Sequence, residues 1–204
     1  MSPRYPIPAG FQRSEIEVKR SRFITSIGPA TTTEQALAFV STLKQEFLDA
    51  NHNCWAYLIG PPGSSDQIGL SDDGEPHGAA GKPMLTVLQH AEVGDVVVVV
   101  TRYFGGTKLG KGGMVKAYTE AVQTGLKQLE IVEKIEWQEL LVSLDYVHLS
   151  AVERLLTDFE AEILNKQFTD QISLQLKFPA EQRQPLRQRL TDLCAGNISF
   201  HPDT

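Results

Sequence analysis

Five consecutive valines at positions 96–100 constrain the fold of this 204-residue chain more than any other feature. Valine is branched at Cβ and is enriched in pleated strands. Residues 95–102 are therefore predicted to form a buried strand. The valine run is the longest unbroken aliphatic stretch of the chain, and a membrane span needs about 20 apolar residues. No membrane segment is therefore predicted.

The two parts of the chain differ in charge and in glycine content. Residues 1–135 hold 13 Lys and Arg against 14 Asp and Glu, whereas residues 136–204 hold 6 against 11. All glycines but Gly196 precede residue 126. Because glycine serves tight turns and close approach of the backbone to a ligand, we predict a working domain over residues 1–135 and a compact accessory domain over residues 136–204.

Strand and helix signals predict an α+β fold for both parts. In the first part, strands are expected over 15–27, 53–59 and 95–102, and helices over 84–91 and 114–129. A further helix is expected after a capping box with Thr31 as N-cap and Glu34 three residues on. The second part reads β-α-β-β-α-β, which indicates a ferredoxin-like domain.

The net charge and the two cysteines bear on the kind of ligand and on the location of the protein. The net charge of −6 excludes a wholesale basic nucleic-acid binder, but it leaves room for a local basic site. The first eight residues lack the apolar stretch typical of a secretory signal, and two cysteines, Cys54 and Cys194, predict no disulfide framework. We therefore expect a cytoplasmic location. No CxxC or paired-histidine spacing predicts a metal centre. No cofactor is expected and no catalytic residue is assigned.

A basic glycine-rich segment follows the valine strand. Between residues 96 and 119 the chain has four basic residues and no acidic one. Glycine amides at a helix N-terminus favour an anion, and lysine and arginine add positive charge. We expect a phosphate ligand, with RNA as one source and with Tyr103 and Phe104 stacking on bases. The predicted contacts are Arg102, Tyr103, Gly105, Gly106, Lys108, Gly110, Lys111, Gly112, Gly113 and Lys116.

Two other interpretations of this segment stay open. The glycines can simply form a tight strand-to-helix turn. Gly105, Gly110 and Lys111 also fit a phosphate-binding P-loop, but Gly112 stands where a Ser or Thr should hold magnesium. Nucleotide hydrolysis of the P-loop kind is therefore not favoured.

An acidic turn with Asp72, Asp73 and Glu75 has three interpretations. It can hold a hard cation, it can be a solvated turn before the next helix, or it can pair with the basic segment and position it. His52 and Lys82 are expected to border the same site. His52 and Cys54 share one face of a predicted strand, but Cys54 is interpreted as a small core residue rather than a nucleophile.

Five segments of the chain form a recognisable set of motifs. They are Lys19-Arg20-Ser21-Arg22-Phe23-Ile24, His52-Asn53-Cys54-Trp55-Ala56, Ser71-Asp72-Asp73-Gly74-Glu75-Pro76, Gly81-Lys82-Pro83 and the segment from Val100 to Tyr118. Together these motifs resemble the IMPACT family, in its bacterial YigZ-like branch. The resemblance covers about residues 15–130, and the chain after about residue 136 resembles the extra C-terminal domain of that branch. Ala79 departs from the family, which usually has Thr or Ser there.

The resemblance implies a fold and a function. The N-terminal domain should resemble domain 2 of ribosomal protein S5, and the C-terminal domain a ferredoxin-like domain of elongation factor G. Eukaryotic members of the family regulate translation through a protein partner. We therefore expect a non-enzymatic, translation-linked regulator that binds RNA or a ribosomal element, and we expect RNA binding to weaken without a lower melting temperature when Arg102 and Lys108 become Ala.

Two alternatives belong to other functional classes. The first is an enzyme acting on a phosphorylated small molecule or nucleotide, with Asp72, Asp73 or His52 as acid–base groups. The second is a protein-interaction module that uses the acidic C-terminal domain to bind a protein partner.

Overall fold

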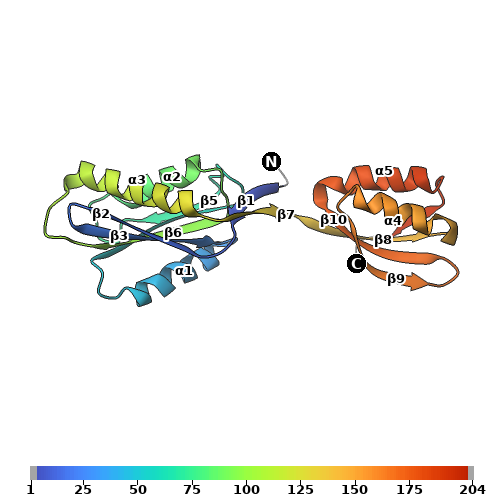
Figure 1. Cartoon of the computed structure of the whole chain (residues 1–204), viewed down its shortest axis with the longest axis horizontal. Helices are drawn as coiled ribbons and strands as arrows, with labels where there is room; N and C mark the ends of the chain where they lie inside the picture. The colour runs from blue at the N-terminus through green and yellow to red at the C-terminus, as the bar shows by residue number, and fades with distance from the viewer. Residues whose placement is uncertain (1–3, 202–204) are drawn as a thin grey trace. The chain divides into compact units, whose positions relative to one another are not determined.

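The computed structural model describes residues 4–201 and divides the chain into two compact units, Met1–Lys134 and Ile135–Thr204. Both units combine helices with β-sheet, as Figure 1 shows. The strand pairs of the two larger sheets are antiparallel. The prediction of a mixed fold of helices and sheets is confirmed.

The first unit is built on a five-stranded sheet. Its strands lie in the order β2-β3-β6-β4-β5. Because β6 is central, the valine run is flanked by a strand on each side. A separate two-stranded sheet joins β1 and β7. The bounds are β1 (Arg4–Pro8), β2 (Gln12–Val18), β3 (Ser21–Pro29), β4 (His52–Ile59), β5 (Gln67–Ser71), β6 (Val96–Tyr103) and β7 (Ile131–Ile135).

Helices cover both faces of this sheet. Helix α1 (Thr33–Glu46) lies on one face, and α2 (Gly81–His90) and α3 (Gly110–Gln128) lie on the other (Figure 1). Successive strand residues point to opposite faces. Accordingly, Val97 and Val99 pack with the core on the α1 side, whereas the other three valines pack under α2 and α3. The two covering layers explain why all five valines are fully buried.

Three predicted helix starts in the first unit were wrong. Helix α2 begins at Gly81 rather than at residue 84. The N-cap of α1 is Thr32 rather than Thr31, and its hydroxyl accepts a hydrogen bond from the Gln35 amide at 3.3 Å. Gln35, not Glu34, reaches back to the Thr31 amide at 2.8 Å. Helix α3 begins at Gly110 rather than at residue 114, because the apolar pattern that marks the helix starts only after its glycine-rich first turn.

The second unit has the predicted order β-α-β-β-α-β. Its sheet runs β11-β8-β10-β9. The alternating apolar side chains of β10 are fully buried, as the period-two pattern predicts. The bounds are β8 (Trp137–Leu144), α4 (Leu149–Thr157), β9 (Glu162–Phe168), β10 (Ile172–Pro179), α5 (Arg183–Leu193) and β11 (Ile198–His201), with 3-10 turns at Tyr146–His148 and Ala180–Gln182.

Within residues 4–201, no helix has both the length and the apolar character needed to cross a membrane.

Candidate functional site

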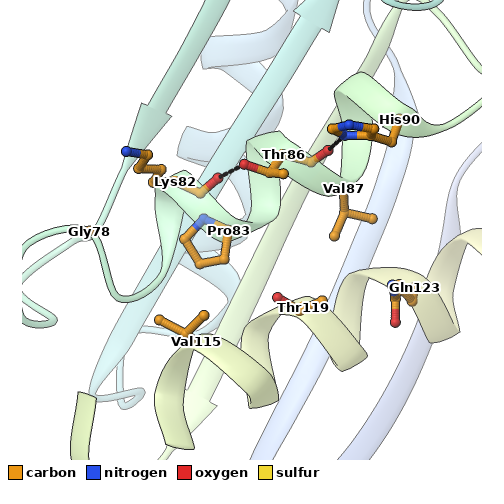
Figure 2. A pocket seen from close by; sticks show the side chains of 9 residues that line it. All are labelled: Gly78, Lys82, Pro83, Thr86, Val87, His90, Val115, Thr119 and Gln123. Carbon is orange, nitrogen blue, oxygen red and sulfur yellow. Dashed lines mark hydrogen bonds between the residues drawn. The ribbon is translucent and has the colours of Figure 1, made fainter. Parts of the chain in front are cut away.

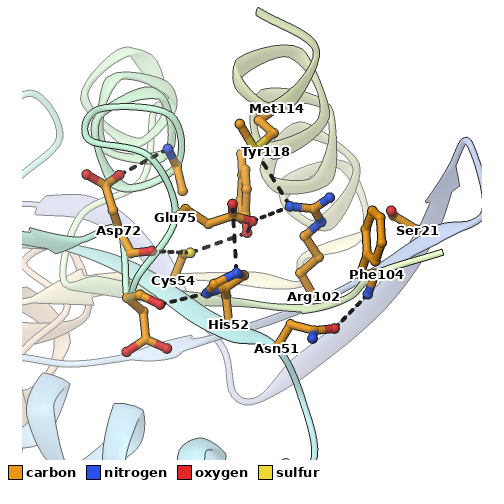
Figure 3. Close-up of polar contacts among 12 residues, drawn as sticks. Ser21, Asn51, His52, Cys54, Asp72, Glu75, Arg102, Phe104, Met114 and Tyr118 are labelled. Carbon is orange, nitrogen blue, oxygen red and sulfur yellow. Dashed lines mark hydrogen bonds and ion pairs between the residues drawn. The ribbon is translucent and has the colours of Figure 1, made fainter. Parts of the chain in front are cut away.

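A cavity of about 460 Å³ lies in the first unit beside the start of α3. We call it the α3 cavity, and Figure 3 shows most of the polar side chains around it. Its volume is typical of sites that bind small molecules. It is lined by Asn51, His52, Glu75, Pro76, Arg102, Phe104, Lys108, Leu109, Gly110, Lys111 and Met114. Residues from the acidic turn and from the basic glycine-rich segment therefore meet in one place.

Strand register determines which side chains reach the cavity. Arg102 shares a sheet face with Val98 and Val100, and its Cα partner on β4 is His52. Tyr103 faces the other way, and its hydroxyl donates to Asp49 Oδ1 at 2.7 Å. Because side chains alternate along a strand, Arg102 lines the cavity and Tyr103 does not.

The floor of the cavity is a buried ion pair. Arg102 Nη1 donates to Glu75 Oε1 at 2.5 Å, and the two residues are only 5% and 7% exposed. The Tyr118 hydroxyl donates to the same carboxylate oxygen at 2.9 Å. The guanidinium also lies against the rings of Phe23 and Phe104. Arg102, which the sequence predicted as a phosphate contact, is thus a buried and paired group.

One donor of Arg102 is left over. Its Nε is buried and has no hydrogen-bond partner among residues 4–201. Buried polar groups nearly always find a partner, because an unpaired one costs about 1–3 kcal/mol. Arg102 lines the cavity, so this unpaired donor belongs to a residue of its wall.

His52 contributes an acceptor to the cavity. Its Nδ1 lies 2.8 Å from the Asp73 carbonyl oxygen, which can only accept, so Nδ1 carries the proton. In the neutral ring Nε2 is then an acceptor. It lies 3.9 Å from Glu75 Oε2, too far for a hydrogen bond. Both atoms can therefore accept a bond from a donor on a ligand.

The other two acids of the turn hold the backbone. The Asp72 carboxylate accepts from the amides of Gly78, Ala80 and Gly81 at 2.7, 3.1 and 2.9 Å. Asp73 accepts from the Asn53 amide at 2.7 Å and pairs with Lys44 at 2.5 Å. Neither carboxylate lines the α3 cavity.

The pKa values of these two acids follow from their partners. Burial by itself would raise the pKa of Asp72, but the three amide hydrogen bonds outweigh it and hold that pKa below its ordinary value. The pKa of Asp73 is lowered in the same way, because Lys44 and the Asn53 amide outweigh burial. Within residues 4–201, no group of three or more His, Cys, Asp or Glu side chains is arranged to hold a metal ion.

Exposed lysines form the rim of the cavity. Lys108 and Lys111 line it and are exposed. Lys116 lies one turn further along α3 and is also exposed. Lys82 lines a different cavity of about 450 Å³ between α2 and α3, together with Thr86 and Thr119 (Figure 2). Of the expected border residues, His52 and Glu75 reach the α3 cavity and Lys82 does not.

The N-terminus of α3 also lies at the rim of the cavity. Its N-cap, Leu109, makes no side-chain capping bond. The first amides of a helix point along its axis without partners inside the helix, and the helix dipole makes this end positive. Together with the two rim lysines, this end of α3 favours a negatively charged ligand.

The glycines of the segment serve different purposes. A Cβ on Gly105 would lie 2.0 Å from the backbone of Arg20, so packing requires glycine there. Gly106 and Gly110 have positive φ angles of 83° and 70°. At Gly112, a Cβ would meet no atom within 4 Å. The close-packed and positive-φ glycines support the tight-turn interpretation, whereas nothing in the fold demands Gly112.

Cys54 is a core residue. It is fully buried, and its thiol contacts the Asp72 carbonyl oxygen at 3.0 Å. Burial raises the pKa of this thiol to about 12. A thiol with such a pKa stays protonated at neutral pH and is a poor nucleophile.

Comparison with known proteins assigns the chain to a family. The model of the Impact N-terminal domain matches residues 19–126, and that of a domain of unknown function, DUF1949, matches residues 142–197. The chain belongs to the IMPACT family. The IMPACT family member YigZ of Escherichia coli is 39% identical over 194 residues, which are 95% of this chain and 95% of that protein. The resemblance seen in the sequence motifs is confirmed.

Two solved structures extend the comparison. A crystal structure described as that of a hypothetical protein is 37% identical, covers 98% of both chains and has a TM-score of 0.68. The structure of Yih1, described as a two-domain translational regulator, is 29% identical and covers 59% of this chain and 47% of its own, with a TM-score of 0.40.

Proposed function

We propose that this IMPACT-family chain is a translation-linked regulator that binds RNA or a ribosomal element at the rim of the α3 cavity. The observation that carries the proposal is the pair of exposed lysines, Lys108 and Lys111, beside the uncapped N-terminus of α3. We infer the link to translation from the resemblance to the IMPACT family. Fold-level analogy supplies no ligand, so the RNA contact is argued from the site.

The rim has the chemistry of a phosphate contact. Lysine ammonium groups and helix amides both bind phosphate oxygens. Phe104 is 47% exposed beside them and offers an aromatic face on which an unpaired base can stack. Tyr103 has no such role in this proposal, since its hydroxyl is bound to Asp49 on the other face of the sheet.

Fluorescence anisotropy with a structured ribosomal RNA fragment, at about 50 and about 200 mM salt, tests the proposal. Each lost phosphate contact should reduce the slope of log affinity against log salt by about one. We expect the Lys108→Gln/Lys111→Gln variant to have a shallower slope than the wild type. Lys127→Gln removes one exposed charge at the other end of α3 and should leave the slope unchanged. Absence of binding at low salt, or equal slopes for all variants, would contradict the proposal.

The enclosed part of the cavity supports a second function, an enzyme acting on a phosphorylated small molecule or nucleotide. The observation that favours it is the acceptor Nε2 of His52 inside the cavity. Asp72 and Asp73 are less suited to acid–base work, because backbone amides and Lys44 occupy their oxygens. Thermal shift with nucleotides separates the two functions: a rise of several degrees that depends on magnesium favours the enzyme.

A further inference from the structure

The α3 cavity separates hydrogen-bond donors from acceptors. At the rim lie Lys108, Lys111 and the N-terminus of α3. At the floor lie two acceptors, His52 Nε2 and Glu75 Oε2, 3.9 Å apart. A ligand that satisfies both ends carries a negative charge at one end and a hydroxyl or amine donor at the other.

The cavity contains buried charged side chains in addition to the N-terminus of α3. Arg102 is 5% exposed, and its charge is balanced by Glu75. Its buried Nε has no partner among residues 4–201, although the residue lines the cavity. The positive charge available to a ligand therefore comes from the rim, and the floor offers the two acceptors.

Gly112 indicates where the anion lies. It is in the first turn of α3, where alanine would be the better helix former. A Cβ at this position would point into open space, so the fold gives no reason for glycine. Glycine does allow a ligand to approach the helix amides closely.

We propose that the α3 cavity binds a nucleotide through a terminal phosphate monoester, either as a free nucleoside monophosphate or as the phosphorylated end of an RNA. A monoester carries a charge of about −1.5 to −2 at neutral pH, which matches the two rim lysines and the positive end of α3 better than a single charge does. A backbone phosphate carries chain on both sides and a single charge. In this arrangement a sugar hydroxyl donates to His52 or Glu75, and the base stacks on Phe104.

This inference rests on the proposed function, because it places RNA at the same rim. The test measures binding of one RNA oligonucleotide in three forms, with a 5′-phosphate, with a 3′-phosphate and with neither. Adenosine 5′-monophosphate, adenosine and inorganic phosphate then compete with it. We expect a phosphorylated form to bind at least about tenfold more tightly than the dephosphorylated one, as an added charge-assisted contact allows. The monophosphate should compete, and adenosine should not.

Three variants locate the contact. Gly112→Ala should raise the melting temperature, because it favours the helix, and should abolish the preference for a terminal phosphate. Lys111→Gln should reduce that preference without a change in melting temperature. Lys127→Gln, on the same helix, should behave as wild type.

The outcomes separate this inference from the proposed function. Equal binding of all three RNA forms, with the rim lysines still needed, overturns the terminal-phosphate inference and leaves the RNA proposal standing. Binding of the monophosphate without binding of RNA overturns the RNA proposal and supports the inference for free nucleotides. Competition by inorganic phosphate as strong as by the monophosphate overturns recognition of a nucleotide. A Gly112→Ala variant with wild-type preference overturns the placement at α3.

Discussion

The floor and the rim of the α3 cavity differ in whether their charged side chains are buried and paired. On the floor, Glu75 and Arg102 are buried and neutralise each other at 2.5 Å. At the rim, Lys108 and Lys111 are exposed, and neither forms an ion pair with another residue in the range 4–201. The basic glycine-rich segment contributes Arg102 to the floor and both lysines to the rim. The partners that the fold gives a basic residue therefore decide how much free positive charge it offers to a ligand.

The two regions should therefore respond differently to mutation. Removing one partner of a buried pair leaves the other charge uncompensated in a poorly solvated place. Removing an exposed lysine changes folding stability little, but it removes a charge that a polyanion would meet. The predictions below use this contrast, in order of decreasing effect on stability.

Arg102→Ala should have the largest effect on stability. It leaves Glu75 buried without its guanidinium partner, and we expect the free energy of unfolding to fall by about 3–5 kcal/mol. Urea denaturation measures this loss. The sequence led us to expect an unaltered melting temperature when Arg102 and Lys108 both become Ala, and the buried ion pair replaces that expectation. Stability equal to that of Lys108→Ala would show that the floor and the rim do not differ.

Two glycines of one segment should respond with opposite signs. Gly105→Ala forces a Cβ to within 2.0 Å of the Arg20 backbone, and such overpacking costs about 1–3 kcal/mol. Gly112→Ala meets open space in the first turn of α3, and it should stabilise the protein by up to about 1 kcal/mol. Thermal unfolding of the matched pair measures both changes. If both variants lose stability, Gly112 has a structural role that the fold does not reveal.

Asp72 should contribute to stability in a pH-dependent way. Its pKa in the folded protein lies below the ordinary value, so its contribution is fully present above the unfolded pKa of about 3.9 and is lost as the pH falls through the folded pKa. Asp72→Asn should therefore flatten the acid side of the curve of stability against pH. Urea unfolding between about pH 6 and pH 2 measures the curve. An unchanged acid slope in the variant would contradict the role of the three amide bonds.

The rim lysines should have the smallest effect on stability. Lys108→Gln and Lys111→Gln remove exposed charges, and each should change the free energy of unfolding by no more than about 0.5 kcal/mol. The same samples serve for the RNA measurements. A large loss of stability in either variant would mean that the rim, like the floor, holds the fold together.

Local pattern was enough to predict much of the fold. Five valines at 96–100 indicated a buried strand, and the alternation along residues 172–178 indicated a strand with one buried face. These inferences hold because side-chain period and backbone preference act over a few residues. The motifs also pointed to the IMPACT family, which the domain matches confirm.

The sequence predicted only some of the residues that form the candidate site. His52 and Glu75 were placed at its border, and the glycine-rich segment at its centre, because their residue types suit polar chemistry. Nothing local showed that Tyr103 would bind Asp49, or that Leu109 and Met114 would line a cavity. Helix starts were misplaced by one residue at α1, by three at α2 and by four at α3, since capping and glycine-rich turns carry weak periodic signals.

By itself, the sequence determined the helices, the central strands and the family of this chain, because those depend on neighbouring residues and on motifs, but it gave no sign of the strands β1, β5 and β7. Only the tertiary structure decided the state of Arg102. Its burial depends on the register of β6 with β4, and its pairing depends on a turn 27 positions away that brings Glu75 beneath α3. The electrostatics of a site follow from distances in space, and folding sets those distances between residues that are far apart in the chain.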